Sequence, residues 1–388
     1  MADKRTDGYS AAFSTYSGLL GEVLEMEANS RWIEDIHATD LSLEAIYPIE
    51  AEQTAGRYML DPVLTMETAL EPGSQLLLTT YGGAYLVRDT ALPTLQETAK
   101  LSGTALSRMT AEAYSKVMNE GFNVAKGRTL MLERYGKLSA CHSGSDSGYE
   151  VIPISRLLEI TAREAEERFG EIEFRNGYNS HSYTDAWWML PDAQSRLIDA
   201  YQNALSDAGI SSSYAISFMP ALHFYSSDTA NSCASLTPVF MMNDRRPIQL
   251  VEGVKVKHSR KGAERSGIEE YQEKIRGVYA LFDDMAAAVR RLASVTVFHP
   301  ENCVISLCRR YGIAKKYGEA AREETMRCLG GARTVNGHDL FLSMTAASAA
   351  AREMEASKYT VSNIDEALGR ISALRDFREH DVGGTVAW

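Results

Sequence analysis

The stretch from residue 128 to residue 158 constrains the fold most, because a short β-hairpin there is followed, after one loop, by a helix. Thr129–Glu133 and Leu138–His142 are predicted strands, with a turn at Gly136 between them. A loop rich in Gly and Ser follows, and Pro153 opens the predicted helix. Strands joined by so short a turn pair antiparallel, so we expect an α+β fold.

Strand patterns continue from the hairpin to about residue 262. The links between them are of hairpin length, which predicts a twisted, largely antiparallel sheet packed by helices. Helices are expected over Ile154–Phe169 and Asp192–Asp207, and turns at Gly177 and Asn243-Asp244. The further predicted strands are Glu171–Asn176, Ser182–Met189, Tyr214–Met219, Ala221–Tyr225, Pro238–Met242, Ile248–Val251 and Val254–Lys257.

The N-terminal region differs from this β-rich part because it mixes both kinds of element. Ser74–Thr80 is a short apolar run bounded by Gly and Pro, which predicts a strand. Thr94 and Glu97 are expected to form the capping box of a helix. The residues from Thr94 to Met109 resemble a helix-turn-helix, but polar side chains take positions that should be apolar. Two short packed helices are therefore favoured.

The C-terminal region is predicted to be helical. Apolar residues recur every three or four positions over Ile268–Leu292, which predicts one amphipathic helix of about seven turns. We expect other helices of the chain to cover its apolar stripe, and an oligomer is the alternative cover. Further helices are expected from Pro300, over Asn336–Glu355, and from a cap at Ser362 and Asp365 to about Phe377. The predicted regions are 1–125, mixed α/β; 126–265, an antiparallel β-rich core; and 266–388, helical.

The composition is that of a globular protein. The chain has 388 residues, of which 45% are hydrophobic and 24% charged. No apolar run approaches the roughly 20 residues that span a bilayer, and the N-terminus lacks the apolar segment of a signal peptide, so a cytoplasmic protein is expected. Five cysteines, an odd number, predict reduced thiols, and Cys303 with Cys308 makes a poor zinc site because no second close pair follows.

Cationic residues gather in one segment, although the chain has a formal net charge of -12. Seven Lys or Arg and two Glu lie between residues 245 and 265, a local net charge of +5. Lys255 and Lys257 alternate with valines, so a strand would direct both to one side. Contact with nucleic-acid phosphates and a solvated edge strand defended by lysines both explain the pattern. The candidate nucleic-acid-binding residues are Arg245, Arg246, Lys255, Lys257, His258, Arg260 and Lys261.

Aromatic side chains cluster in the β-rich part and could stack on bases, although core packing is the favoured explanation for most of them. Consecutive Trp187 and Trp188 would point to opposite faces of a strand, so one is expected in the core and the other partly exposed. The aromatic candidates are Tyr178, Tyr183, Trp187, Trp188, His223, Phe224 and Tyr225.

Polar residues of the same part suggest a metal or nuclease site as a weaker alternative. No HExxH or HxH spacing accompanies them, and the P-loop, GxSxG and GxGxxG motifs are absent. We therefore expect no cofactor, no metal and no catalytic residue. The polar residues in question are His181, Asp185, His223 and Asp228.

Several segments together resemble one family of uncharacterised proteins encoded by phages and plasmids, known only as a domain of unknown function. The hairpin and its sequel resemble the family's "LLR" strand, "G-x-(I/V)-x-A" return strand, "SD-x-Y" loop and "x-I-P-x-x-x-L-L" helix start. Pro220–Phe240 resembles its "S-D-T-G" segment, with Ala230 where glycine is expected. Val254–Gly262 resembles "+-x-+-H-x-G", and the tail DVGGTVAW resembles a frequent phage ending. The resemblance covers roughly residues 90 to 388 and implies no chemistry.

These observations favour a non-catalytic accessory protein of a phage or plasmid, acting in the host cytoplasm. Handling of single-stranded nucleic acid in replication, recombination or annealing is the expected function. The alternative is a protein-binding role in host-defence evasion or particle assembly, in which the acidic surface would meet a basic partner from the phage or the host. A metal-dependent nuclease is the third and weakest possibility.

Overall fold

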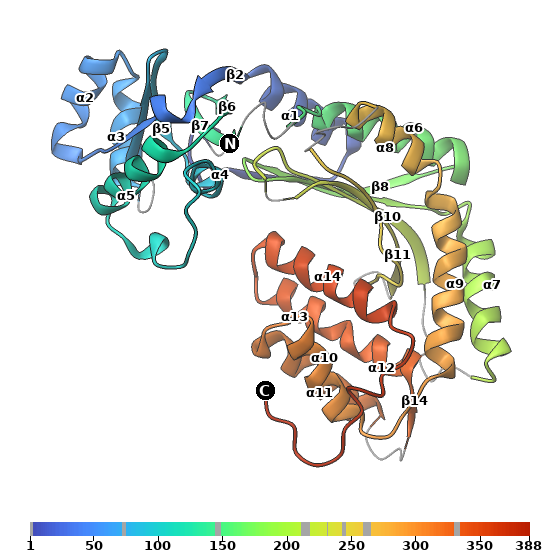
Figure 1. The fold of residues 1–388 in the computed structure, drawn as a ribbon. Helices are drawn as coiled ribbons and strands as arrows, with labels where there is room; N and C mark the ends of the chain where they lie inside the picture. Colours follow the sequence, from blue (N-terminus) through green and yellow to red (C-terminus); the bar gives the residue numbers. More distant parts are fainter. Residues whose placement is uncertain are drawn as a thin grey trace.

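Within the described residues, the computed structural model contains two large β-sheets, a two-stranded sheet of β14 (Thr296–Val297) and β15 (Val335–Asn336), and a C-terminal helical region (Figure 1). It describes residues 3–71, 75–143, 149–210, 218–230, 232–242, 246–258, 265–329 and 334–388. Antiparallel sheets, packing helices and a helical C-terminal region together confirm the predicted α+β class. Among the helices within those ranges, none is both long and apolar enough to cross a bilayer.

The first sheet lies in the N-terminal part of the chain and contains the predicted hairpin. Its strand order is β2-β6-β7-β5-β4-β3, antiparallel throughout except for the parallel pair β5 and β7. Tyr135 and Gly136 form the hairpin turn with positive φ angles of 50° and 78°, as a two-residue turn requires. The strands are β2 (Ser30–His37), β3 (Ser42–Ala45), β4 (Leu76–Thr80), β5 (Gly83–Val87), β6 (Arg128–Arg134) and β7 (Lys137–Ser143).

Short helices cover this first sheet. The predicted capping box of Thr94 and Glu97 is wrong, because Thr94 lies inside a helix and its hydroxyl donates to the carbonyl of Ala91 over 2.9 Å. A 3-10 turn at Leu106–Arg108 lies between this helix, α4 (Leu92–Thr98), and α5 (Ala111–Val124), so no helix-turn-helix forms over Thr94–Met109. The helices are α2 (Ala51–Tyr58), α3 (Pro62–Leu70), α4 (Leu92–Thr98) and α5 (Ala111–Val124).

The second sheet is antiparallel, as the hairpin-length links predicted. Its order is β1-β8-β9-β10-β11-β12, and β13 also pairs with β11. The predicted boundary at residue 125 does not separate the two sheets. β1, which precedes this boundary, belongs to the second sheet, whereas the hairpin β6-β7, which follows it, belongs to the first. The strands are β1 (Ser10–Phe13), β8 (Glu173–Ser180), β9 (Thr184–Met189), β10 (Phe218–Ser226), β11 (Ala234–Met242), β12 (Arg246–Ile248) and β13 (Val254–Val256).

Two predicted interruptions of this sheet are wrong. β8 runs through Gly177, which pairs with Ala186. A Cβ at Gly177 would lie 2.6 Å from the side chain of Leu19, so the glycine lets α1 (Tyr16–Ala28) pack closely on the strand. β10 is likewise one strand through Pro220, where two were expected. The predicted turn at Asn243-Asp244 lies outside the described residues.

Four helices pack on the outer face of the second sheet (Figure 1). The predicted single helix over Ile268–Leu292 is wrong, because the chain turns at Arg276-Gly277 while the apolar stripe continues on both sides. Glycine is a poor helix former, and the break lets α8 contact α6 while α9 contacts α7. The helices are α6 (Ile154–Phe169), α7 (Gln194–Asp207), α8 (Gly267–Ile275) and α9 (Val278–Ser294).

The C-terminal helices lie together beside the second sheet (Figure 1), and α12 (Gly337–Met344) also contacts α9. The predicted helix over Asn336–Glu355 is divided at Thr345. The predicted cap of the last helix is also wrong, since Ser357 is its N-cap and accepts a hydrogen bond from the N–H of Thr360 over 3.2 Å. The elements are β14 (Thr296–Val297), α10 (Pro300–Arg310), α11 (Lys315–Leu329), β15 (Val335–Asn336), α12 (Gly337–Met344), α13 (Ala346–Glu353) and α14 (Lys358–Ser372).

The cysteines behave as the composition predicted. All five lie within the described residues and are free thiols. Cys303 and Cys308 are buried side chains of α10, and burial raises the pKa of the Cys308 thiol to about 12 and that of Cys303 further. Such thiols stay protonated and unreactive at neutral pH.

A buried ionic cluster joins the two sheets. Lys137 and Arg88, whose side chains are 1% and 0% exposed, place Nζ and Nη1 2.9 and 3.3 Å from Oδ1 of Asp7. Arg134 of β6 forms an ion pair with Asp228, in the loop after β10. The cations belong to the first sheet and its edge, whereas the carboxylates flank β1 and β10, so each pair spans the junction.

Phe282 tests whether α9 belongs to the core of a single chain. Its buried ring lies 5.7 Å from that of Phe169 and 5.9 Å from that of Phe240. Phe282→Ala should lower the free energy of unfolding in urea by about 3–5 kcal/mol through the cavity that it leaves. Asp283→Ala, on the exposed face of the same turn, is the matched control and should change it by less than about 0.5 kcal/mol. Intact stability with loss of an oligomer would contradict the prediction.

Candidate functional site

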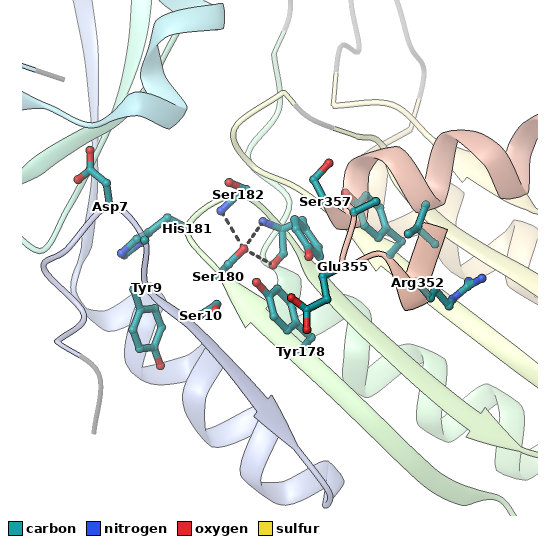
Figure 2. A pocket seen from close by; sticks show the side chains of 15 residues that line it. Asp7, Tyr9, Ser10, Tyr178, Ser180, His181, Ser182, Arg352, Glu355 and Ser357 are labelled. Carbon is teal, nitrogen blue, oxygen red and sulfur yellow. Dashed lines mark hydrogen bonds between the residues drawn. The ribbon is translucent and has the colours of Figure 1, made fainter. Parts of the chain in front are cut away.

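Two adjoining cavities lie between the second sheet and helices α13 and α14. Their volumes are about 660 and 190 Å³, and Tyr225, Arg352 and Val361 line both. We call them together the inner groove. Figure 2 shows the larger cavity, with Tyr178 and Ser180 on the sheet and Arg352 at the end of α13. A cavity of 660 Å³ falls within the range of about 300–1,000 Å³ that is usual for ligand sites.

The alternation of side chains along the strands builds the sheet wall of the inner groove. Along β9, Trp188 packs in the main core at 1% exposure, whereas Trp187 faces the groove and is partly exposed. The predicted division of the two tryptophans is therefore confirmed. The same period directs six polar and aromatic side chains of β8, β9, β10 and the β8-β9 turn into the groove, namely Tyr178, Tyr183, Asp185, Trp187, His223 and Tyr225.

Three tyrosine rings form a stacked line on this wall, which we call the tyrosine ladder. The rings of Tyr178 and Tyr183 lie 5.2 Å apart and those of Tyr183 and Tyr225 5.0 Å apart, with interplanar angles of 19° and 20°. Burial raises the pKa of the Tyr183 hydroxyl, so this central ring is uncharged at neutral pH. Tyr178 is half-buried, and it is the ring at the accessible end of the ladder.

Beside the ladder, Asp185 fixes two neighbouring rings. Its Oδ2 lies 2.6 Å from Nε2 of His223, and its Oδ1 accepts a hydrogen bond from Nε1 of Trp187 over 2.9 Å. The two rings stack at 3.9 Å with an interplanar angle of 12°. Because the carboxylate holds both rings from adjacent strands, they present a rigid planar surface to the smaller cavity. A planar ligand could stack on such a surface.

The helical wall of the inner groove carries mixed charge. Arg352 donates from Nη2 to Asp365 over 2.7 Å and also contacts Ser348. Glu355 and Ser357 line the same wall (Figure 2). The groove therefore offers hydroxyls, carboxylates and two guanidiniums, that of Arg352 and that of Arg175 on the sheet wall of the smaller cavity.

Two of the predicted nucleic-acid-binding residues form ion pairs with the C-terminal helices. Arg246 of β12 lies 3.4 Å from Glu324 of α11, and Lys255 of β13 lies 3.2 Å from Glu366 of α14. These pairs connect the second sheet to the helical region. The role of both residues in nucleic-acid binding stays a prediction, and their charges are already partly neutralised.

The remaining predicted residues divide into two groups. Lys257 is exposed, whereas His258 is 7% exposed and stacks at 5.4 Å on the ring of Tyr149. Burial lowers the pKa of His258, so its ring is neutral at pH 7 and offers no charge to a phosphate. Arg245, Arg260 and Lys261 lie outside the described residues.

The weaker metal hypothesis finds no support in the geometry. Nε2 of His181 lies 2.9 Å from the carbonyl of Lys4, and Asp228 pairs with Arg134. Only Asp185 and His223 meet. Across the described ranges, no three His, Cys, Asp or Glu side chains come together in a way that could hold a metal ion.

Comparison with known proteins adds no assignment. No family model, no curated protein and no solved structure matches this chain. The resemblance to the phage and plasmid family thus stays a prediction, and the function must be inferred from the groove itself.

Sequence reasoning found the sheet wall of the groove but missed its helical wall. The aromatic candidates on β8, β9 and β10 were named because they cluster within one predicted sheet. Arg352 and Ser357 lie more than 120 residues after the last of them, in an Ala-rich stretch without a motif. No signal in the sequence indicated that this stretch would face the sheet.

The buried histidines predict how stability depends on pH. Burial lowers the pKa of His142 to about 4, and burial with the nearby Arg88 and Arg134 lowers that of His181 to about 2. In the unfolded chain both histidines bind a proton near pH 6.5. In the folded protein they stay neutral at that pH because their pKa values are lower. Stability is therefore greatest above pH 6.5 and should fall by up to about 1.4 kcal/mol per pH unit for each histidine as the pH drops from 6.5 toward 4.

Urea denaturation at pH 7 and at pH 5 measures this dependence. His142→Phe keeps the ring that stacks on Tyr149 at 3.9 Å but cannot titrate, so it should reduce the pH dependence by about one proton. An unchanged pH dependence in the variant would show that His142 is protonated in the folded protein.

Proposed function

We propose that this chain is a non-catalytic accessory protein of a phage or plasmid and that it holds single-stranded nucleic acid in the inner groove. One observation carries the proposal: the tyrosine ladder and the Trp187–His223 pair lie on one face of an antiparallel sheet, along two adjoining cavities. Every base has a π-face, so aromatic side chains on a sheet can bind single strands with little sequence preference.

Tyr178 is the ring on which a base would stack. It is half-buried, whereas Tyr183 and Tyr225 behind it are almost fully buried and support it. A ring that is already fixed by its neighbours loses little conformational entropy when a ligand binds. Base stacking on such a ring contributes about 1–3 kcal/mol.

Binding in the inner groove would depend on stacking more than on phosphate contacts. Lys255 and Arg352, which are near the sheet and the groove, are paired with Glu366 and Asp365. The net charge of -12 also opposes the approach of a polyanion. A protein that neutralises few phosphates has an affinity that changes little with salt. We therefore infer weak binding with a shallow salt dependence.

The test is a titration of a fluorescein-labelled oligothymidylate of about 12 nucleotides, followed by anisotropy at about 50 and 200 mM salt. Tyr178→Ala should weaken binding roughly 5- to 150-fold, as the loss of one stacked base requires. Tyr81→Ala is the matched control, because Tyr81 is 92% exposed in the β4-β5 turn and does not line the groove. It should leave the affinity unchanged.

Three outcomes would contradict this proposal. The native protein could show no binding at about 50 mM salt. Tyr178→Ala could bind as tightly as the native protein. The affinity could also fall with salt as steeply as the release of about six to ten counterions requires, which would show that the protein binds the phosphates and not the bases.

The protein-binding alternative is favoured by one observation, an exposed apolar stripe on α3. Val63, Met66 and Leu70 follow one another at helical spacing and are 57%, 37% and 62% exposed. Asp61 and Glu71 flank the stripe, so a basic amphipathic helix fits it best. A peptide with Leu at this spacing and Lys elsewhere should bind the native protein and not Val63→Glu/Leu70→Glu. Equal binding to both would exclude this surface.

A further inference from the structure

A third cavity, of about 260 Å³, lies where the first sheet meets the second, and we call it the junction pocket. His142 at the end of β7, Cys233 before β11 and His258 after β13 contribute to its wall. None of the residues that line it lines the inner groove. The junction pocket is therefore a separate candidate site.

Stacked aromatic rings form one side of the junction pocket. The ring of Tyr149 lies 3.9 Å from that of His142 and 5.4 Å from that of His258, with interplanar angles of 19° and 13°. Trp32 lies beside both His142 and Tyr149, with ring-centroid distances of 6.0 and 5.8 Å. Rings held parallel in this way make a wall that suits a flat ligand.

Hydrogen bonds fix the tautomers of both histidines. Nε2 of His142 lies 2.9 Å from the carbonyl of Asp228, and Nδ1 of His258 lies 3.3 Å from the carbonyl of Glu150. A carbonyl only accepts, so each of these nitrogens carries the proton. In His258 the lone pair is consequently on Nε2.

Nε2 of His258 is a buried acceptor without a donor. The residue is 7% exposed, and this atom has no hydrogen-bond partner among the described residues. A buried polar atom left unsatisfied costs about 1–3 kcal/mol, so native structures rarely keep one without a water or a ligand. The atom therefore lacks a donor in the part of the chain that the structure describes, and an N–H or O–H of a ligand in the pocket would satisfy it.

The rim of the junction pocket carries one charge of each sign. Lys257 and Glu97 are both exposed and both line it. An ammonium suits a phosphate, while a carboxylate suits the hydroxyls of a ribose. Ser143 and Ser232 add hydroxyls to the same wall.

We propose that the junction pocket binds a nucleoside monophosphate. The base lies against the ring wall and donates an N–H to Nε2 of His258, Lys257 contacts the phosphate, and Glu97 accepts from the ribose hydroxyls. All common bases carry an N–H donor, so the geometry points to the class of ligand and not to one base. This inference rests on a different site from the proposed strand-binding groove and survives its failure.

Isothermal titration of the full-length protein with AMP, GMP, CMP and UMP tests the proposal. At least one of them should bind. His258→Phe keeps the ring but removes the acceptor, so it should lower the affinity about 5- to 150-fold. Lys257→Gln should weaken binding of the monophosphate and leave binding of the corresponding nucleoside unchanged.

Two controls separate the junction pocket from other sites. Lys255→Gln, two residues from Lys257 but paired with Glu366, should bind the nucleotide as the native protein does. Tyr178→Ala, in the inner groove, should also bind it normally. Loss of nucleotide binding in Tyr178→Ala would move the ligand to the groove and overturn the proposal.

Two further results would also overturn it. If ribose 5-phosphate binds as tightly as the best nucleotide, the base is not recognised. If no nucleotide binds the native protein at millimolar concentration, the junction pocket does not take this class of ligand. An unchanged melting temperature of His258→Phe, with nucleotide binding lost, would show that the variant folds and that the acceptor is needed.

Discussion

The arrangement of the two sheets depends on the buried carboxylate of Asp7. Lys137 and Arg88 lie 2.9 and 3.3 Å from its Oδ1, and the N–H of Asp89 donates to its Oδ2 over 3.1 Å. Burial lowers the pKa of Arg88 to about 10, which leaves the guanidinium charged at neutral pH. Without Asp7, two buried cations of the first sheet would lose a partner, at a cost of about 3–5 kcal/mol for a broken buried pair. The segment that carries Asp7 is thereby held against the first sheet just before β1 joins the second.

The same ionic junction shapes both candidate sites. Asp7 and Tyr9 line the end of the inner groove, and Asp228, which pairs with Arg134, accepts the hydrogen bond that orients His142 in the junction pocket. Ion pairs of Lys255 and Arg246 with α14 and α11 connect the opposite side of the sheet to the helical region. These charged side chains form ion pairs within the protein and are therefore less available to a ligand. The surfaces that remain for ligands are mainly aromatic.

Local patterns predicted elements well wherever neighbours in the sequence decide the structure. The hairpin turn at Tyr135-Gly136 and the bounds of α6 follow from turn geometry and from apolar spacing alone. Predictions failed where a distant contact decides. Gly177 is inside a strand because Leu19 needs the space, and Gly277 separates two helices because each packs on a different partner. A glycine marks a special position, but the sequence does not say which neighbour requires it.

The sequence by itself determined the α+β class, the antiparallel pairing, the opposite directions of Trp187 and Trp188, and the reduced state of the cysteines. These properties depend on the period of the apolar residues, on link length and on composition, which can all be read along the chain. Only the tertiary structure decided that Lys255 faces a carboxylate, that the aromatic wall lies under α13 and α14, and that His258 is buried in a ring stack. The physical reason is that the partner of a charge or a ring is set by packing between segments more than 100 residues apart, and no local pattern encodes it.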